Sequence, residues 1–244
     1  MMKIRILALA SLLTSLPCAI AQSNSNYDRA QAAFDLGNYD ASIRLLSPLA
    51  QAGEPASNAL IGYAYLKRLS SPNDVSDAMS AFRKAAVAGS ASAQFMLGFF
   101  YSNGHYGYDK DETEAAKWAL SAARQGVADS QSLIGFYYAA GMGGLEKSSS
   151  VAVCWFRRAA SQGDAGAQYN LGRAISIGEG APEDYAEGYK WLNLAARQGI
   201  EKAVDLRDAL KPLLTSAQLA EAQRASTNWR SSPETREPSK QNCN

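Results

Sequence analysis

An internal repeat of 36 to 37 residues constrains the fold of this chain more than any other feature. Five glycines recur at that spacing, and each of the last four follows an Ala-Ala pair: Gly53, Gly89, Gly126, Gly163 and Gly199. Periods in this range are typical of stacked repeat architectures, in which one unit cannot cover its own apolar face. Each unit is therefore expected to be stable only when it stacks on another.

Each repeat has the pattern of two helices. In the first helix of the third unit, Ala93, Leu97-Gly98 and Tyr101 follow the i, i+4, i+8 spacing of one buried face. A glycine inside a helix lowers stability by about 1 kcal/mol relative to alanine, so a neighbouring backbone is expected to lie close to Gly98. We expect Trp118, on the second helix, to fill the space opposite. The repeat-closing glycines stand where a left-handed C-cap would turn the chain into the next unit.

Tryptophan marks a column of the second helix. Three of the four tryptophans stand eight residues before a closing glycine, and Ala81 occupies that place in the earlier unit: Trp118, Trp155 and Trp191. With the leucine-glycine and Ala-Ala columns, this pattern resembles the Sel-one-like repeat, a relative of the tetratricopeptide repeat. The resemblance covers residues 54–199, with departures at Ile175 and Gly188. It implies an all-α fold, a right-handed α/α solenoid of about five helical hairpins plus a C-terminal capping helix pair.

The predicted solenoid occupies residues 22–229. Its hairpins are expected at 27–53, 54–89, 90–126, 127–163 and 164–199, followed by a cap at 200–229. In that cap, Thr215 and Gln218 have the spacing of a capping box. The last segment, 230–244, contains Ser-Ser-Pro-Glu and a further proline, so we expect a disordered tail there.

The N-terminal residues have the order of a secretory signal peptide. Two basic residues precede an uncharged apolar run at 6–16, and the small-x-small triplet that ends in Ala21 follows, so cleavage is expected after Ala21 and the signal peptide is 1–21. The run is too short to cross a bilayer as a helix, which favours an export signal over an anchor. Pro17 before Cys18 argues against lipoprotein processing at that cysteine. The mature chain is expected in the periplasm or outside the cell, with no membrane insertion.

Composition limits the chemistry that the chain can perform. With 24 basic and 23 acidic residues, nothing in the overall charge favours nucleic-acid binding. One histidine, His105, and three cysteines are too few for a zinc site or a histidine-dependent triad, so we expect no metal, no cofactor and no enzymatic activity. The acids in 109–114 are interpreted as the charged start of a helix rather than as a calcium or acid-base site.

Cys154 and Cys243 are the two cysteines beyond the signal sequence. A scaffold held by disulfides uses cysteine far more densely, so packing is expected to hold this fold. Cys243 stands in a tail that can reach many places, which leaves a bridge open. The sequence does not favour one.

A second face of the first helices is rich in aromatic residues. The positions three before and one after each helix glycine lie four residues apart, away from the core columns, and their candidate partner-binding residues are Tyr63, Phe95, Phe99, Phe136, Tyr169 and Arg173. The resemblance implies that first helices line the concave side, where relatives bind peptides or protein segments. Aromatic residues and arginine dominate the energetics of protein interfaces. The alternative, that these side chains pack between adjacent hairpins, stays open.

The predicted function is an exported, non-catalytic scaffold, expected to be a monomer, that binds a protein or peptide partner in the concave groove as an envelope adaptor or regulator. The resemblance also allows a periplasmic immunity protein that neutralises a secreted toxin. A third hypothesis is a hydrolase acting on cell-wall or β-lactam substrates through the acidic segment at 109–114. The sequence leaves the partner and the choice among these roles open, because a fold does not fix a function.

Overall fold

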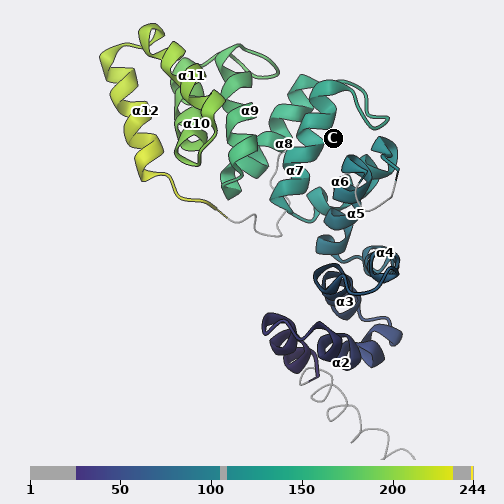
Figure 1. The fold of residues 1–244 in the computed structure, drawn as a ribbon. Coiled ribbons are helices and arrows are strands. Elements are labelled where there is room, and N and C mark those ends of the chain that lie inside the picture. Colours follow the sequence, from purple (N-terminus) through teal and green to yellow (C-terminus); the bar gives the residue numbers. More distant parts are fainter. Residues whose placement is uncertain (1–25, 105–108, 233–242, 244) are drawn as a thin grey trace, which may run out of the picture. The chain divides into compact units, whose positions relative to one another are not determined.

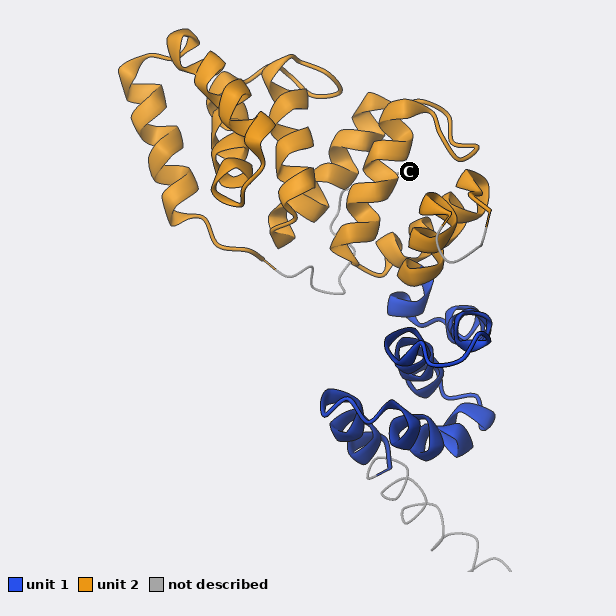
Figure 2. Ribbon diagram, viewed as in Figure 1, with its two compact units in different colours: residues 1–94 blue, residues 95–244 orange. Residues whose placement is uncertain are grey.

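The computed structural model describes residues 26–104, 109–232 and 243, and within them all regular secondary structure is helical (Figure 1). The predicted all-α class is confirmed. The chain forms two compact units, residues 1–94 and 95–244 (Figure 2). The signal peptide predicted at 1–21, and His105, lie outside the described residues.

Unit 1 consists of helical pairs that pack in sequence order. A helix at 26–35 precedes α2 (Tyr39–Gln51), α3 (Pro55–Arg68) and α4 (Asp74–Val87), and α5 (Ala91–Asn103) begins at the end of the unit. The α3 helix packs against both α2 and α4. Small and branched side chains from four successive helices form the core: Ala30, Leu46, Leu60, Ile61 and Ala81.

Unit 2 continues the same arrangement from the rest of α5. Its helices are α6 (Glu112–Arg124), α7 (Ala128–Ala140), α8 (Ser149–Gln162), α9 (Ala165–Ser176), α10 (Tyr185–Arg197), α11 (Glu201–Leu210) and α12 (Ser216–Asn228), with a 3-10 turn at Lys211–Leu213. From α6 to α11 each helix packs against the next, and α12 packs against α10. The capping box predicted at Thr215 and Gln218 opens α12, which confirms that prediction.

The repeat-closing glycines end helices as predicted. All five have left-handed backbone angles, with φ values of 87°, 94°, 92°, 104° and 90° in chain order. In the four units with an Ala-Ala pair, the amide after the glycine donates to the carbonyl of the first alanine, as Val127 N does to Ala122 O at 3.2 Å and Asp164 N to Ala159 O at 3.2 Å. Because any other residue is strained at these angles, the glycine column follows from the backbone.

The helix glycines make room for the second helix of the same hairpin, but the prediction for Trp118 is wrong. A Cβ added to Gly98 would lie 3.1 Å from the amide nitrogen of Ala119, and one added to Gly135 would lie 2.7 Å from the ring of Phe156. The residue one place after the tryptophan column therefore packs against the glycine. The indole column lies further round the helix, where Trp155 shares an apolar cluster with Ala119 of the preceding hairpin.

A column of buried side-chain amides joins each hairpin to the one before it, and the sequence analysis missed it. Each amide donates to the carbonyl of an alanine three residues before a closing glycine. The pairs are Asn58 to Ala50 at 3.2 Å, Gln94 to Ala86 at 3.0 Å, Gln131 to Ala123 at 3.1 Å and Gln168 to Ala160 at 3.2 Å. The amide oxygens of Gln131 and Gln168 also accept from Gln162 and Gln198, at 2.8 Å and 2.9 Å. Glutamine recurs here at the repeat spacing, which is the signal that sequence reasoning could have used.

Cys154 and Cys243 form a disulfide, a bridge that the sequence did not favour. Their Cα atoms are 5.6 Å apart, and the bond closes a loop across a sequence separation of 89. Cys243 is buried in the apolar cluster of Trp155 and Ile134. Of the tail predicted to be disordered at 230–244, only 230–232 and Cys243 are described. Cys154 of α8 packs against the same cluster, so both cysteines of the bridge lie beside Trp155 and Ile134.

A buried ion pair fixes the loop between α3 and α4 in unit 1. The Arg68 guanidinium binds the fully buried carboxylate of Asp74 and also reaches Asp40 of α2 at 2.7 Å. The backbone amides of Ser70 and Ser71 donate to Asp74 at 2.7 Å and 3.1 Å. The hydrogen bond from Arg68, together with these amides, lowers the pKa of Asp74 to about 2. This carboxylate is therefore held in its charged form by the folded loop.

Candidate functional site

The six side chains predicted to bind a partner are divided between the two units. Tyr63 belongs to unit 1, and the others belong to unit 2. In unit 2, α5 carries Phe95 and Phe99, α7 carries Phe136, and α9 carries Tyr169 and Arg173.

Tyr63 lines an apolar pocket in unit 1. Its ring meets the edge of Phe82 at a centroid distance of 5.0 Å, and its half-buried position raises the pKa of its hydroxyl, which forms a hydrogen bond with Ser92. The pocket has a volume of about 830 Å³ and includes Tyr27 and Phe34 from the helix at 26–35. Tyr63 thus packs within its hairpin on one side and faces an open pocket on the other.

Phe99 and Phe136 are the exposed members of the predicted aromatic face. Their exposed fractions are 39% and 48%, whereas the other five of the seven phenylalanines are buried or half-buried. Most other exposed large aliphatic side chains stand at helix ends or turns: Leu36, Leu69, Val87, Ile177 and Leu213. Phe99 and Phe136 instead lie well inside α5 and α7, where helix termination does not account for their exposure.

The remaining residues of the face are engaged within unit 2. Phe95 is half-buried, with its ring 6.3 Å from that of Phe99. Tyr169 packs against the cluster of Tyr189, and Arg173 pairs with Glu179 at 3.1 Å. The aromatic face therefore has members of two kinds. Tyr169 packs against neighbouring helices, whereas Phe99 and Phe136 are exposed.

An acidic pair borders this face at the start of α7. Asp129 precedes Ser132 and Phe136 at the i, i+3, i+7 spacing of one helix face. Partial burial raises the pKa of Asp129, and the nearby carboxylate of Asp164 raises it further. Asp164 is the N-cap of α9 and accepts from the amide of Ala167 at 2.5 Å. The sequence analysis missed Asp129 because its pairing with Asp164 depends on how two repeats stack.

The acidic residues of 109–114 that were considered for catalysis include the N-cap and first turn of α6. Asp111 is the N-cap and accepts from the amides of Thr113 and Glu114 at 3.0 Å each, which confirms the interpretation of this acid as a helix start. Glu114 accepts from the Trp118 indole at 3.0 Å. Within 26–104, 109–232 and 243, no three His, Cys, Asp or Glu side chains are grouped to hold a metal ion. In the same residues, no helix combines the length and apolarity needed to span a membrane.

The comparisons with known proteins bear on the repeats themselves. The family model described as Sel1 repeat matches residues 91–127, 128–164 and 165–200. The chain is a Sel1-repeat protein. Proteins with this repeat typically act as protein-interaction scaffolds, and their solenoid fold is generally non-catalytic. A search of curated proteins found no match.

Solved structures of other proteins share the fold. A Sel1 repeat protein from Oxalobacter formigenes is 29% identical, with a TM-score of 0.68, over 84% of this chain and 85% of that chain. The protective antigen c5321 of uropathogenic Escherichia coli strains, which displays an SLR fold, is 23% identical, with a TM-score of 0.58 over 86% of this chain. The match covers 54% of the length of the antigen chain. Together they place this Sel1-repeat protein among solenoids of stacked helical hairpins.

Proposed function

We propose that this Sel1-repeat protein is an exported adaptor or regulator of the cell envelope that binds a segment of another protein along the faces of α5 and α7. The observation that carries the proposal is the exposure of Phe99 and Phe136 inside these helices. Aromatic side chains are enriched at interaction surfaces and among the residues that contribute most to binding.

The carboxylates of Asp129 and Asp164, beside this face, favour a partner segment with a positive charge. Asp129 follows the same helix face as Phe136, and its raised pKa reports an unfavourable carboxylate environment next to Asp164. A cation placed there would relieve the repulsion between the two acids. The partner segment is therefore expected to present apolar side chains to the two phenylalanines and a lysine or arginine to the acidic pair.

Export is supported by two independent features. The first is the predicted signal peptide at 1–21. The second is the disulfide between Cys154 and Cys243, since disulfides persist in oxidising compartments such as the periplasm and are rare in the cytosol. Both features support a periplasmic or secreted location.

The test is affinity capture from periplasmic extract with the wild-type chain and with the double variant Phe99→Ala, Phe136→Ala. Removing two central aromatic contacts is expected to weaken partner binding at least 10-fold, because each truncation of such a contact typically has an effect above 1 kcal/mol. The matched control is Val204→Ala with Leu213→Ala, which removes exposed aliphatic side chains of the same unit. Circular dichroism should show the same helicity for all three proteins. Equal capture by both double variants would show that the faces of α5 and α7 are not the binding surface.

A further inference from the structure

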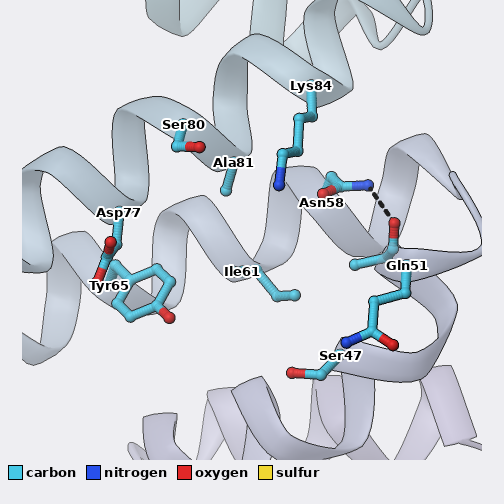
Figure 3. Close-up of a pocket in the computed structure, with 10 residues that line it drawn as sticks. Ser47, Gln51, Asn58, Ile61, Tyr65, Asp77, Ser80, Ala81 and Lys84 are labelled. Atoms are coloured by element: carbon cyan, nitrogen blue, oxygen red, sulfur yellow. Dashed lines mark hydrogen bonds between the residues drawn. The ribbon is translucent and has the colours of Figure 1, made fainter.

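A second pocket of unit 1 lies between α2, α3 and α4 (Figure 3). It has a volume of about 230 Å³, which is below the range of roughly 300–1,000 Å³ that drug-sized ligands occupy. The residues that line it include Ala50, Ile61, Tyr65 and Ala81. Its size suits a single side chain rather than a whole cofactor.

This pocket occupies the place that a tryptophan fills in other repeats. Ala81 stands in the column of Trp155 and Trp191, eight residues before the closing glycine. Trp155 shares its apolar cluster with Ala123, Ile134 and Tyr138, which are the counterparts, two repeats later, of three pocket residues: Ala50, Ile61 and Tyr65. Trp191 likewise shares a cluster with Ala160, Leu171 and Ile175. In unit 1, the residues that surround the indole in other repeats are therefore present, but Ala81 has a methyl group in place of the ring.

The hydrogen-bond acceptor of that site is also present. Trp118 and Trp191 donate their indole N–H to the glutamate four residues earlier, at 3.0 Å and 3.2 Å. Four residues before Ala81 stands Asp77, which lines the pocket. Within the described part of the chain, the Asp77 carboxylate has neither an ion pair nor a side-chain hydrogen bond.

The fourth repeat shows what happens without an acceptor. Four residues before Trp155 stands Val151, and the buried Trp155 Nε1 has no hydrogen-bond partner among the described residues. The carboxylate of Asp77 stands in the first turn of α4, as those of Glu114 and Glu187 stand in the first turns of α6 and α10. It is the feature that an indole N–H would use.

A cation completes the site. Lys84 follows Ala81 by three residues, as Arg158 follows Trp155, and the Arg158 guanidinium lies 4.9 Å from the centre of that indole ring. In Figure 3, Lys84 extends from α4 toward Ile61 and Asn58, along the wall of the pocket. A ring bound beside Ala81 would meet an ammonium group in the position that favours a cation–π contact.

We propose that this pocket binds the indole ring of a tryptophan side chain presented by a partner protein. Ile61 and Tyr65 contact its faces, Asp77 accepts its N–H, and Lys84 lies over the ring. This indole pocket, defined by these residues with Ala50 and Ala81, uses residues of unit 1 only. It is independent of Phe99 and Phe136, so either proposal can fail without the other.

The test uses N-acetyl-tryptophanamide as the probe and the ¹⁵N-labelled full chain as the target. Nuclear magnetic resonance titration should show saturable shifts centred on Ile61, Asp77 and Ala81, with a Kd of about 1 mM for so small a ligand. N-acetyl-leucinamide and the N1-methylated indole should bind at least 5-fold more weakly, because the first lacks the ring and the second lacks the N–H. Free tryptophan binding more tightly than the blocked probe would instead assign the pocket to a free amino acid and overturn the protein partner.

Two variants make the proposal falsifiable in the protein itself. Ala81→Trp should fill the pocket from within, abolish binding of the probe and leave Tm unchanged or higher. Asp77→Ala should weaken the probe several-fold and remove its advantage over the N1-methylated form, whereas Asp205→Ala, an exposed acid of unit 2, should change neither. A lowered Tm for Ala81→Trp, or the absence of saturable shifts in the wild-type chain, would overturn the proposal.

Discussion

Replacing Gln131 by leucine tests whether the buried amide column holds successive hairpins together. Gln131 is fully buried, donates to Ala123 O at 3.1 Å and accepts from Gln162 at 2.8 Å. Leucine removes both hydrogen bonds, each of which contributes about 1 kcal/mol. The Ala123 carbonyl keeps the amide of Gly126 at 3.0 Å, and the half-buried Gln162 returns to water. Leucine recovers part of the loss through apolar burial.

The expected result for Gln131→Leu is a decrease of about 1–2 kcal/mol in the free energy of unfolding. Urea unfolding followed by circular dichroism measures it, and Tm should fall by about 4 °C. Gln51→Leu is the matched control, because Gln51 is exposed on α2 and its replacement should stay within about 0.5 kcal/mol. Indistinguishable midpoints for the two variants would show that the amide column contributes nothing to stacking.

Three further perturbations test other parts of the structure. Cys154→Ser should lower the free energy of unfolding by up to about 4 kcal/mol, since the bridge closes a long loop. In dithiothreitol, the wild type should unfold at the same temperature as the variant. A wild-type Tm that does not change with the reductant would refute the bridge. The folded-state pKa of Asp74, about 2, lies below its ordinary value of about 4, so the free energy of unfolding should fall as the pH drops from about 4 to 2. Asp74→Asn should reduce this pH dependence. An unchanged slope in the variant would contradict the ion pair. Gly135→Ala places a Cβ 2.7 Å from the ring of Phe156 and should lower the free energy of unfolding by about 1–3 kcal/mol. Gly166→Ala, whose Cβ has no neighbour closer than 3.4 Å, should raise it by about a few tenths of a kcal/mol. Equal effects of the two substitutions would rule out the close approach at Gly135.

The features that the sequence predicted depend on the backbone. A closing glycine such as Gly126 is required by a left-handed angle, and the capping box at Thr215 is a local hydrogen-bond pattern, so both can be recognised from spacing alone. The core columns follow from helical periodicity for the same reason, and Leu97 and Ile134 are fully buried. The all-α class and the order of the repeats could therefore be predicted from local sequence patterns.

The features that the sequence did not predict depend on how the second helix is rotated. Placing Trp118 opposite Gly98 required the direction of a side chain, and a shift of one residue, about 100° around a helix, puts Ala119 there instead. The bridge from Cys154 to Cys243 depends on the path of the tail, which has no periodicity. The split of the aromatic face, with Tyr169 packed and Phe136 exposed, likewise depends on the offset between neighbouring hairpins.

The most direct test of the proposed function is site-specific photo-crosslinking in cells that export the chain. Benzophenone replaces the side chain at Phe99 or Phe136, and at Val204 or Leu213 as controls of similar exposure in the same unit. Binding along α5 and α7 predicts that the first two positions crosslink to one and the same partner protein, while the two controls give no adduct. Adducts of equal yield from all four positions, or from the controls alone, would contradict it.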